Sequence, residues 1–168
     1  MNGISLQQQL KELISGGKSM GLQMLAGVCR KSELEVIKAL PEGMGTLFEG
    51  SYFDKVWQML TEIDTLTFFI ESSGNIFEFK TKVEHGREGF GYFNLFGKNC
   101  LNGHLRKETV SSIALLKIPF MQLESRQVAF INTDGKVMYS FYLPREGQKI
   151  DPKAEELFNS FIAENGAN

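Results

Sequence analysis

Apolar residues in the first part of the chain recur at intervals of three and four positions, which is the spacing of one face of an α-helix. The pattern covers three short segments, residues 5–14, 22–29 and 32–40. Ser32 and Glu35 form a capping-box pair at the start of the third segment, and Pro41 follows its end. We therefore expect an N-terminal helical annex over residues 1–41.

Two further segments carry the same helical spacing. Between residues 51 and 63, apolar side chains recur at Phe53, Val56, Trp57 and Leu60. Near the C-terminus, Asp151 is a strong N-cap residue and Pro152 suits the first helical turn. We expect helices over residues 51–63 and 151–164, with Trp57 as a core anchor.

Between residues 65 and 143 the apolar pattern changes to the short runs that are typical of β-strands. These runs span residues 66–71, 76–82, 92–96, 101–106, 110–118, 127–132 and 137–143. The links between most of them are short enough for hairpins, which join antiparallel strands. The pattern predicts an α+β fold, in which a large, mostly antiparallel, meandering sheet over residues 65–143 packs against the N-terminal helices and a C-terminal helix.

Composition limits the classes of protein that need consideration. A chain of 168 residues, 42% of them hydrophobic, matches one domain over residues 1–168. The formal net charge of -2 provides no field that would attract nucleic acid or an anionic membrane. Cys29 and Cys100 are far apart and form no CxxC motif, which suits a reducing compartment. We expect a cytoplasmic protein without a signal peptide, stable membrane insertion or a nucleic-acid partner.

Residues 22–40 have the size of a helix-turn-helix, so a transcriptional regulator is one alternative. A recognition helix needs several cationic or amide side chains that reach phosphates and bases. The second helix of this pair offers Glu33 and Glu35 with only Lys38 in compensation. Its charge therefore opposes DNA recognition.

The usual catalytic and nucleotide-binding motifs are missing from the sequence, including GxSxG, the P-loop and HExxH. Two histidines and two separated cysteines also cannot form a closed structural zinc site. The densest group of chemically useful side chains is residues 89–108. This stretch combines glycines and aromatic residues with three possible iron ligands, Tyr92, Cys100 and His104.

Haem (heme) is the metal centre that such a stretch suits, because porphyrin supplies four nitrogens and the protein adds one or two axial ligands. Walls for the ring and cations for its propionates are also required. The candidate wall residues are Phe90, Phe93 and Phe96, and the candidate cations are Lys98, Arg106 and Lys107. Strand alternation would place Tyr92 on one face and Phe93 on the other. From the residues alone, a generic binding or dimerisation sheet is the favoured reading.

Several runs, in one order along the chain, resemble the HutX/ChuX family of cytosolic haem-utilisation carriers. They are Leu-Glu-Val-Ile-Lys-Ala-Leu-Pro at 34–41, Phe-Asp-Lys-Val-Trp at 53–57, Gly-Tyr-Phe-Asn-Leu-Phe-Gly-Lys at 91–98, Leu-Asn-Gly-His-Leu at 101–105, Ile-Ala-Leu-Leu at 113–116 and Phe-Met at 120–121. The resemblance extends from about residue 34 to the C-terminal helix and is weakest over the first thirty residues. It is more specific than any single motif.

The resemblance implies a carrier that takes up haem from the inner-membrane importer and passes it to a haem-degrading enzyme. It also implies a homodimer that reproduces the layout of the larger, internally duplicated proteins of the HemS type. The iron-ligand candidates that it implies are Tyr92 and His104. Together with Phe93, Phe96, Lys98 and Arg106, these residues form the expected haem site.

One departure from the family pattern concerns the strand before the first hairpin turn. Some relatives have a histidine there, where this chain has Glu71. His85 lies in a predicted loop and is a possible substitute, although a solvated loop histidine is the simpler interpretation.

An enzyme that degrades haem or reduces a tetrapyrrole is the alternative to a carrier, because the larger relatives include haem-cleaving proteins. A scaffold whose sheet only dimerises is a further alternative. No flavin or nicotinamide motif is visible, which argues against a self-sufficient reductase. A carrier must also release its ligand, which favours a single axial bond in a shallow site.

Overall fold

The computed structural model describes residues 3–17 and 20–166. Among these residues it contains five α-helices. They are α1 (Leu6–Ser15), α2 (Leu22–Cys29), α3 (Glu33–Lys38), α4 (Phe53–Thr61) and α5 (Pro152–Asn165). All five coincide with segments that the helical spacing predicts, although α1 and α5 each extend one residue further. Asp151 caps α5 by accepting a hydrogen bond from the backbone N–H of Ala154, as the Asp-Pro pair suggests.

The strands form an antiparallel sheet of six, a second sheet of three and one short hairpin. The six-stranded sheet has the order β1 (Gly45–Glu49), β7 (Ser112–Leu116), β8 (Gln127–Ile131), β9 (Val137–Tyr142), β2 (Leu66–Ser72) and β3 (Asn75–Thr81). The second sheet contains β4 (Arg87–Gly89), β5 (Tyr92–Phe96) and β6 (Asn102–Leu105). The hairpin pairs β10 (Arg145–Glu146) with β11 (Lys149–Ile150).

The α+β class and the large antiparallel sheet are confirmed, but the expected range of the sheet differs in two respects. Residues 92–105 leave the main sheet and form a separate three-stranded sheet with β4. Strand β1 lies before residue 65, outside the predicted strand runs. This strand forms because it pairs with β7 along its whole length and directs Phe48 into the core, which is a tertiary effect.

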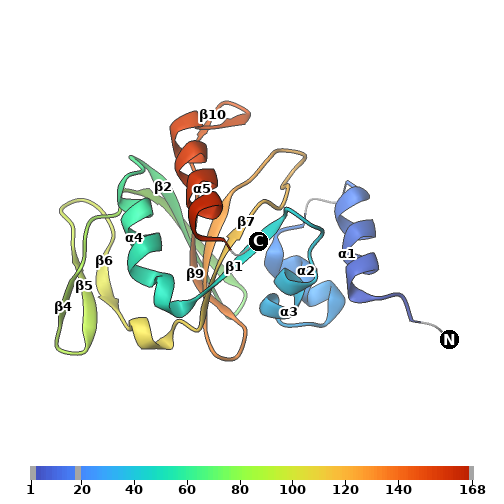
Figure 1. Ribbon diagram of the computed structural model, residues 1–168, viewed down its shortest axis with the longest axis horizontal. Coiled ribbons are helices and arrows are strands. Elements are labelled where there is room, and N and C mark those ends of the chain that lie inside the picture. The colour runs from blue at the N-terminus through green and yellow to red at the C-terminus, as the bar shows by residue number, and fades with distance from the viewer. Residues whose placement is uncertain (1–2, 18–19, 167–168) are drawn as a thin grey trace.

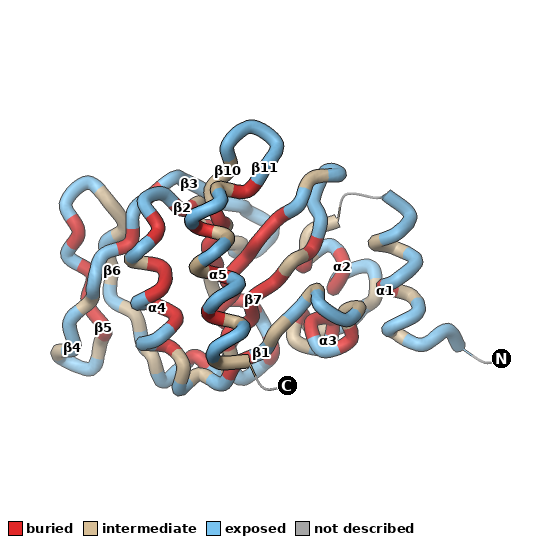
Figure 2. Tube along the Cα trace, turned by 45° about the horizontal axis from the view of Figure 1, so that its top comes forward, coloured by how far each residue is buried: buried red, intermediate tan, exposed pale blue. Residues whose placement is uncertain are grey.

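The helices cover both faces of the six-stranded sheet. Helices α4 and α5 pack on one face, whereas α1, α2 and α3 pack on the other, around two separate clusters of buried side chains. In Figure 1 the N-terminal helices and the three-stranded sheet lie at opposite ends of the molecule, with α4 beside the smaller sheet. Figure 2 shows that buried positions concentrate in the central strands of the six-stranded sheet and alternate with exposed positions along α4 and α5, whereas β3 is largely exposed.

Trp57 of α4 is the centre of the first cluster, as expected for a core anchor. Its ring stacks on Phe53 with centroids 5.5 Å apart and meets the edges of Phe93 and Phe141. The indole N–H donates a hydrogen bond of 3.0 Å to the carbonyl of Glu84. The only tryptophan therefore joins α4 to both sheets.

The helix pair α2–α3 is part of the fold's packed layer. Val36 and Ile37 of α3 are buried, and the carboxylate of Glu33 accepts a hydrogen bond of 2.5 Å from the backbone N–H of Val137 on β9. Burial raises the pKa of Glu33. Much of the helix considered for DNA recognition is thus used to cover the sheet.

Candidate functional site

The three-stranded sheet has one buried face and one open face. Phe93 and Leu95 point into the core, where they are 7% and 4% exposed. Tyr92 and Phe96 alternate with them and belong to the open face. The strand alternation expected from the sequence is therefore present, and it separates Phe93 from Tyr92.

Three of the predicted site residues lie together on the open face. The rings of Tyr92 and His104 have centroids 5.8 Å apart and are inclined at 65°. Arg106 donates a hydrogen bond of 3.3 Å from Nη2 to the hydroxyl oxygen of Tyr92, and its guanidinium carbon lies 5.1 Å from the Tyr92 ring centroid. This hydrogen bond is the main cause of the raised pKa of Arg106, which keeps the guanidinium charged.

His104 contacts Asn94, which is its cross-strand partner between β5 and β6. The Nδ1 atom of His104 lies 2.6 Å from Oδ1 of Asn94. Asn94 is 8% exposed, whereas the histidine ring is exposed. A buried amide therefore holds an exposed imidazole in place.

The other predicted residues differ in their placement. Phe96 is 65% exposed at the end of β5, and Lys98 is exposed in the turn that follows. Phe93 was expected to contact the haem ring, but it does not lie on the open face. Its ring packs edge-on against Phe53 and Trp57, so it supports the sheet from below and cannot form a wall on the open face.

Glu71 and His85 lie outside this group. Glu71 is on β2 of the six-stranded sheet, where its carboxylate accepts a 2.5 Å hydrogen bond from the N–H of Gly74 in the adjoining turn. His85 is exposed in the segment between β3 and β4. Phe90, at the tip of the β4–β5 hairpin, is fully exposed and has a φ of 55°, an uncommon conformation for a bulky residue.

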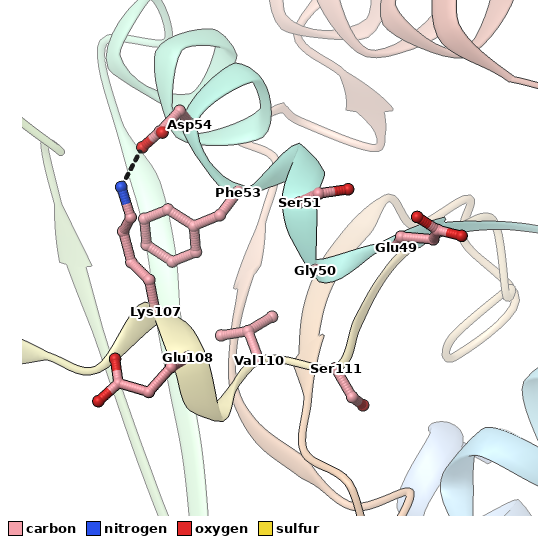
Figure 3. A pocket seen from close by; sticks show the side chains of 9 residues that line it. All are labelled: Glu49, Gly50, Ser51, Phe53, Asp54, Lys107, Glu108, Val110 and Ser111. Carbon is pink, nitrogen blue, oxygen red and sulfur yellow. Dashed lines mark hydrogen bonds and ion pairs between the residues drawn. The ribbon is translucent and has the colours of Figure 1, made fainter.

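Lys107 fastens the three-stranded sheet to α4. Its ammonium group contacts the carboxylates of Asp54 and Glu88, with a distance of 2.7 Å to Asp54. The same nitrogen lies 5.5 Å and 5.3 Å from the ring centroids of Phe53 and Phe93. Figure 3 shows the lysine reaching past the Phe53 ring to Asp54 at the start of α4. The sequence suggested a propionate partner here, but this side chain already has two acidic partners.

The view in Figure 3 also shows an open cleft of about 710 Å³ at the beginning of α4. Its ionisable lining residues are Glu49, Asp54, Lys107 and Glu108. Carboxylates therefore outnumber the cation. This is an unfavourable environment for an anionic ligand.

A second cavity of about 630 Å³ lies between α2 and the sheet face formed by β9, β2 and β3. Its apolar walls include Leu22, Phe69, Ile118, Phe120, Tyr142 and Leu143. The volume is within the range of small-molecule sites. No residue of the 89–108 stretch lines this cavity.

The polar lining residues of this cavity include two cations, Lys80 and Arg145, and one carboxylate, Glu78. One guanidinium nitrogen of Arg145 is buried without a hydrogen-bond partner among the described residues. Burial, with a smaller contribution from Glu78, raises the pKa of Tyr142 to about 12, so its phenol stays protonated near neutral pH. The cavity thus combines apolar walls with two cations and one carboxylate, a small excess of positive charge.

Sequence reasoning did not find this cavity. Its walls come from α2, β2, β3, β9 and the segments 118–127 and 143–145, and no local motif joins them. Period-two alternation does show that Phe68 and Phe69 point to opposite faces of the sheet. It does not show that the N-terminal helices leave the Phe69 face partly uncovered.

Within residues 3–17 and 20–166, no three His, Cys, Asp or Glu side chains are grouped closely enough to hold a metal ion. In the same part of the chain, no helix has the length and apolar character needed to cross a membrane.

Comparisons with known proteins identify related sequences and structures. The model of the family described as "Haem utilisation ChuX/HutX" matches residues 46–161. The intracellular heme transport protein HutX of Vibrio cholerae is 32% identical over 146 residues, which cover 86% of this chain and 76% of that protein.

Solved structures give the same relationship. A structure of the heme-binding protein ChuX has 28% sequence identity and a TM-score of 0.84, and the match covers 95% of this chain and 98% of that one. PhuS, a heme-binding protein from Pseudomonas aeruginosa, shares the fold with a TM-score of 0.77 at 14% identity. That match covers 92% of this chain but only 46% of PhuS. Because the family model and HutX both match most of the chain, this protein is a member of the ChuX/HutX haem-utilisation family.

Proposed function

We propose that this protein binds haem and carries it to another protein, without changing it chemically. HutX is named as a heme transport protein and ChuX as a heme-binding protein, and both match this chain over most of its length. The observation that supports binding most directly is the grouping of Tyr92, His104 and Arg106 on one open face. These residues supply two possible iron ligands and a cation.

The open face suits a ligand that must be given away. Tyr92 and His104 project from the same side of one small sheet, so they approach an iron atom from the same direction. We infer that one of them at a time is the axial ligand. A single axial bond, with the exposed Phe96 beside it, would hold haem less firmly than a deep pocket with two protein ligands.

A hemin titration of the purified protein tests this proposal. We expect a saturable Soret band at about one haem per chain. His104→Ala and Tyr92→Phe should each shift the spectrum or lower the affinity, whereas Asn102→Ala, a change on the same sheet that removes no candidate ligand, should not. If no saturation is seen, the protein is not a haem carrier.

The cavity between α2 and the sheet provides the alternative location for the ring. It has the apolar walls that the open face lacks, and Arg145 and Lys80 suit propionates. Arg145→Gln separates the two locations. Loss of affinity in this variant, with unchanged binding by His104→Ala and Tyr92→Phe, would place haem in the cavity and overturn the assignment of the ligands.

Three partners belong to the same proposal: a second copy of this chain, a haem importer and a haem-degrading enzyme. We infer a homodimer, because this chain matches only 46% of PhuS, so two copies of the chain would be needed to reproduce the length of that relative. We also infer that haem comes from an inner-membrane importer and goes to a haem-degrading enzyme. Mixing the haem-loaded protein with an apo form of such an enzyme should transfer intact haem, which a change in the Soret spectrum would follow.

Haem degradation is the competing function. ChuS, described as a heme oxygenase, shares the fold at 12% identity, with a TM-score of 0.78. Such a likeness supports a common architecture and no common activity. Adding a reductant and oxygen to the loaded protein distinguishes the two, because a carrier keeps its haem spectrum and an oxygenase bleaches it steadily to a linear tetrapyrrole.

A further inference from the structure

Asn94 is an unusual residue for its position. It lies in the central strand of the three-stranded sheet, where asparagine is disfavoured by its strand propensity, and it is 8% exposed. The strand register places it opposite Arg87 on β4 and opposite His104 on β6. A buried amide at this point must satisfy its hydrogen bonds inside the sheet.

The orientation of the Asn94 amide is fixed by three carbonyl groups. Its Nδ2 atom donates to the backbone oxygens of Arg87 at 3.0 Å, Gly89 at 3.0 Å and Tyr92 at 3.1 Å. Carbonyl oxygens only accept hydrogen bonds, so the amide nitrogen must face them. The reversed amide would place its own oxygen against three acceptors. The amide oxygen is therefore left pointing towards β6.

This orientation determines which nitrogen of His104 carries the proton. The Oδ1 atom of Asn94 has no hydrogen to donate and lies 2.6 Å from Nδ1 of His104. Nδ1 must therefore be the donor. In a neutral imidazole the other nitrogen, Nε2, then has a free lone pair. Since the histidine is exposed beside the Tyr92 ring, Nε2 is the atom available for a ligand on the open face.

We propose that Asn94 is a positioning residue, which fixes the Nδ1–H tautomer of His104 and thereby makes Nε2 the iron-binding atom. Metal-binding histidines commonly donate their second N–H to such a partner, which also sets the plane of the ring. The role of Nε2 as a ligand rests on the proposed haem function. The tautomer itself does not, because it follows from hydrogen bonds that are present without a ligand.

The tautomer can be read directly by ¹⁵N NMR of the histidine side chains in the haem-free protein, at a pH where both imidazoles are neutral. The chain has only two histidines, and His85→Gln removes the signals of the other one. We expect His104 to show a protonated Nδ1 and an unprotonated Nε2. A proton found on Nε2 in the wild-type protein would overturn the proposal, whatever haem does.

Two substitutions separate positioning from simple support of the sheet. Asn94→Asp keeps an acceptor for Nδ1 but loses the amide donors, so the fold weakens while the His104 tautomer is retained. Asn94→Ala removes the acceptor, and the ring should return towards the Nε2–H form that imidazole prefers in water. Asn102→Ala is the matched control, because Asn102 bonds to the carbonyls of Gly97 and Cys100 and leaves His104 untouched.

Hemin affinity provides the second measurement. Asn94→Ala should lower it about tenfold to a hundredfold, as outer-shell changes do at metal sites, whereas Asn94→Asp should retain most of it. Equal losses in both variants would contradict the proposed role, because they would reflect damage to the sheet. An Nδ1–H tautomer in a protein that binds no hemin would leave the positioning role intact and refute only the haem function.

Discussion

At the scale of single residues, neighbours in one strand have opposite roles. Phe93 and Phe96 both belong to β5 and both resemble ring contacts in the sequence, yet one is buried against α4 and the other faces solvent. The period-two geometry of a strand accounts for the difference, because Phe93 and Tyr92 cannot share a face. Phe96 does share the face of Tyr92.

Stability should therefore distinguish the two phenylalanines. Phe93→Ala removes a ring from the contact between α4 and the smaller sheet, and we expect a loss of about 3–5 kcal/mol in the free energy of unfolding. Phe96→Ala should change this free energy by no more than about 0.5 kcal/mol. Urea denaturation measures both values. Equal losses would show that the alternation has been assigned incorrectly.

At the scale of elements, the three-stranded sheet depends on a few connections to the rest of the fold. Its inner face packs on α4 through Phe93, and Lys107 joins Asp54 of α4 to Glu88 of β4. The lysine side chain is only 26% exposed, whereas the side chains of Asp54 and Glu88 are 70% and 64% exposed. This arrangement holds the sheet that carries Tyr92 and His104.

Lys107→Ala should loosen that sheet selectively. It removes the cation shared by two mostly exposed carboxylates and the contacts of its ammonium group with Phe53 and Phe93, and we expect a loss of about 1 kcal/mol in the free energy of unfolding. Amide hydrogen exchange should become faster in β4, β5 and β6 and remain slow in β7 and β8. Lys98→Ala, on an exposed turn, is the matched control and should change neither measurement.

The capping box of α3 should make the stability of the folded protein depend on pH. Hydrogen bonds from the backbone and hydroxyl of Ser32, assisted by Lys31, lower the pKa of Glu35 from its ordinary value of 4.5 to about 2. Because the folded state favours the ionised carboxylate, the stabilisation is complete above the unfolded pKa and is lost as pH falls towards 2.

Thermal unfolding between pH 5 and about pH 2 tests whether stability falls with pH in this direction. Glu35→Gln keeps a side chain that can accept from the Ser32 N–H but cannot ionise, so its melting temperature should fall less over this range than that of the wild type. An identical pH dependence in the two proteins would mean that Glu35 makes no such contribution. Glu12→Gln, outside the capping box, is the control.

At the scale of the whole molecule, the two candidate locations for haem lie on different sides of the six-stranded sheet. The smaller sheet with Tyr92 and His104 is joined to α4, whereas the 630 Å³ cavity opens on the face that α2 partly covers. Strand β3 forms a free edge of the main sheet, and its Phe77 and Phe79 are exposed. Exposed aromatic side chains on a free edge are typical of a surface that a partner covers.

A homodimer should be visible in solution without any ligand. Light scattering after size-exclusion chromatography should give about twice the 18.9 kDa mass of the chain. Replacing Phe77 and Phe79 with Ser should shift the particle towards the mass of one chain if β3 belongs to the interface. A wild-type mass of one chain at micromolar concentration would contradict the homodimer.

The sequence by itself determined the helices, most of the strands and the face that Tyr92 occupies. These are local properties, because side-chain periodicity and capping residues act within a few positions of one another. The order of family-like runs from residue 34 onward also pointed to haem utilisation. The comparison with the ChuX/HutX family confirmed that relationship.

Only the tertiary structure decided how distant segments combine. Strand β1 exists because β7 offers it a partner, and residues 92–105 form a separate sheet because their inner face packs on α4. The cavity joins six segments that share no motif, and the hydrogen bond between Asn94 and His104 depends on the register of β5 against β6. Pairing partners, strand register and the covering of a sheet face depend on contacts between residues far apart in the chain, which local periodicity does not encode.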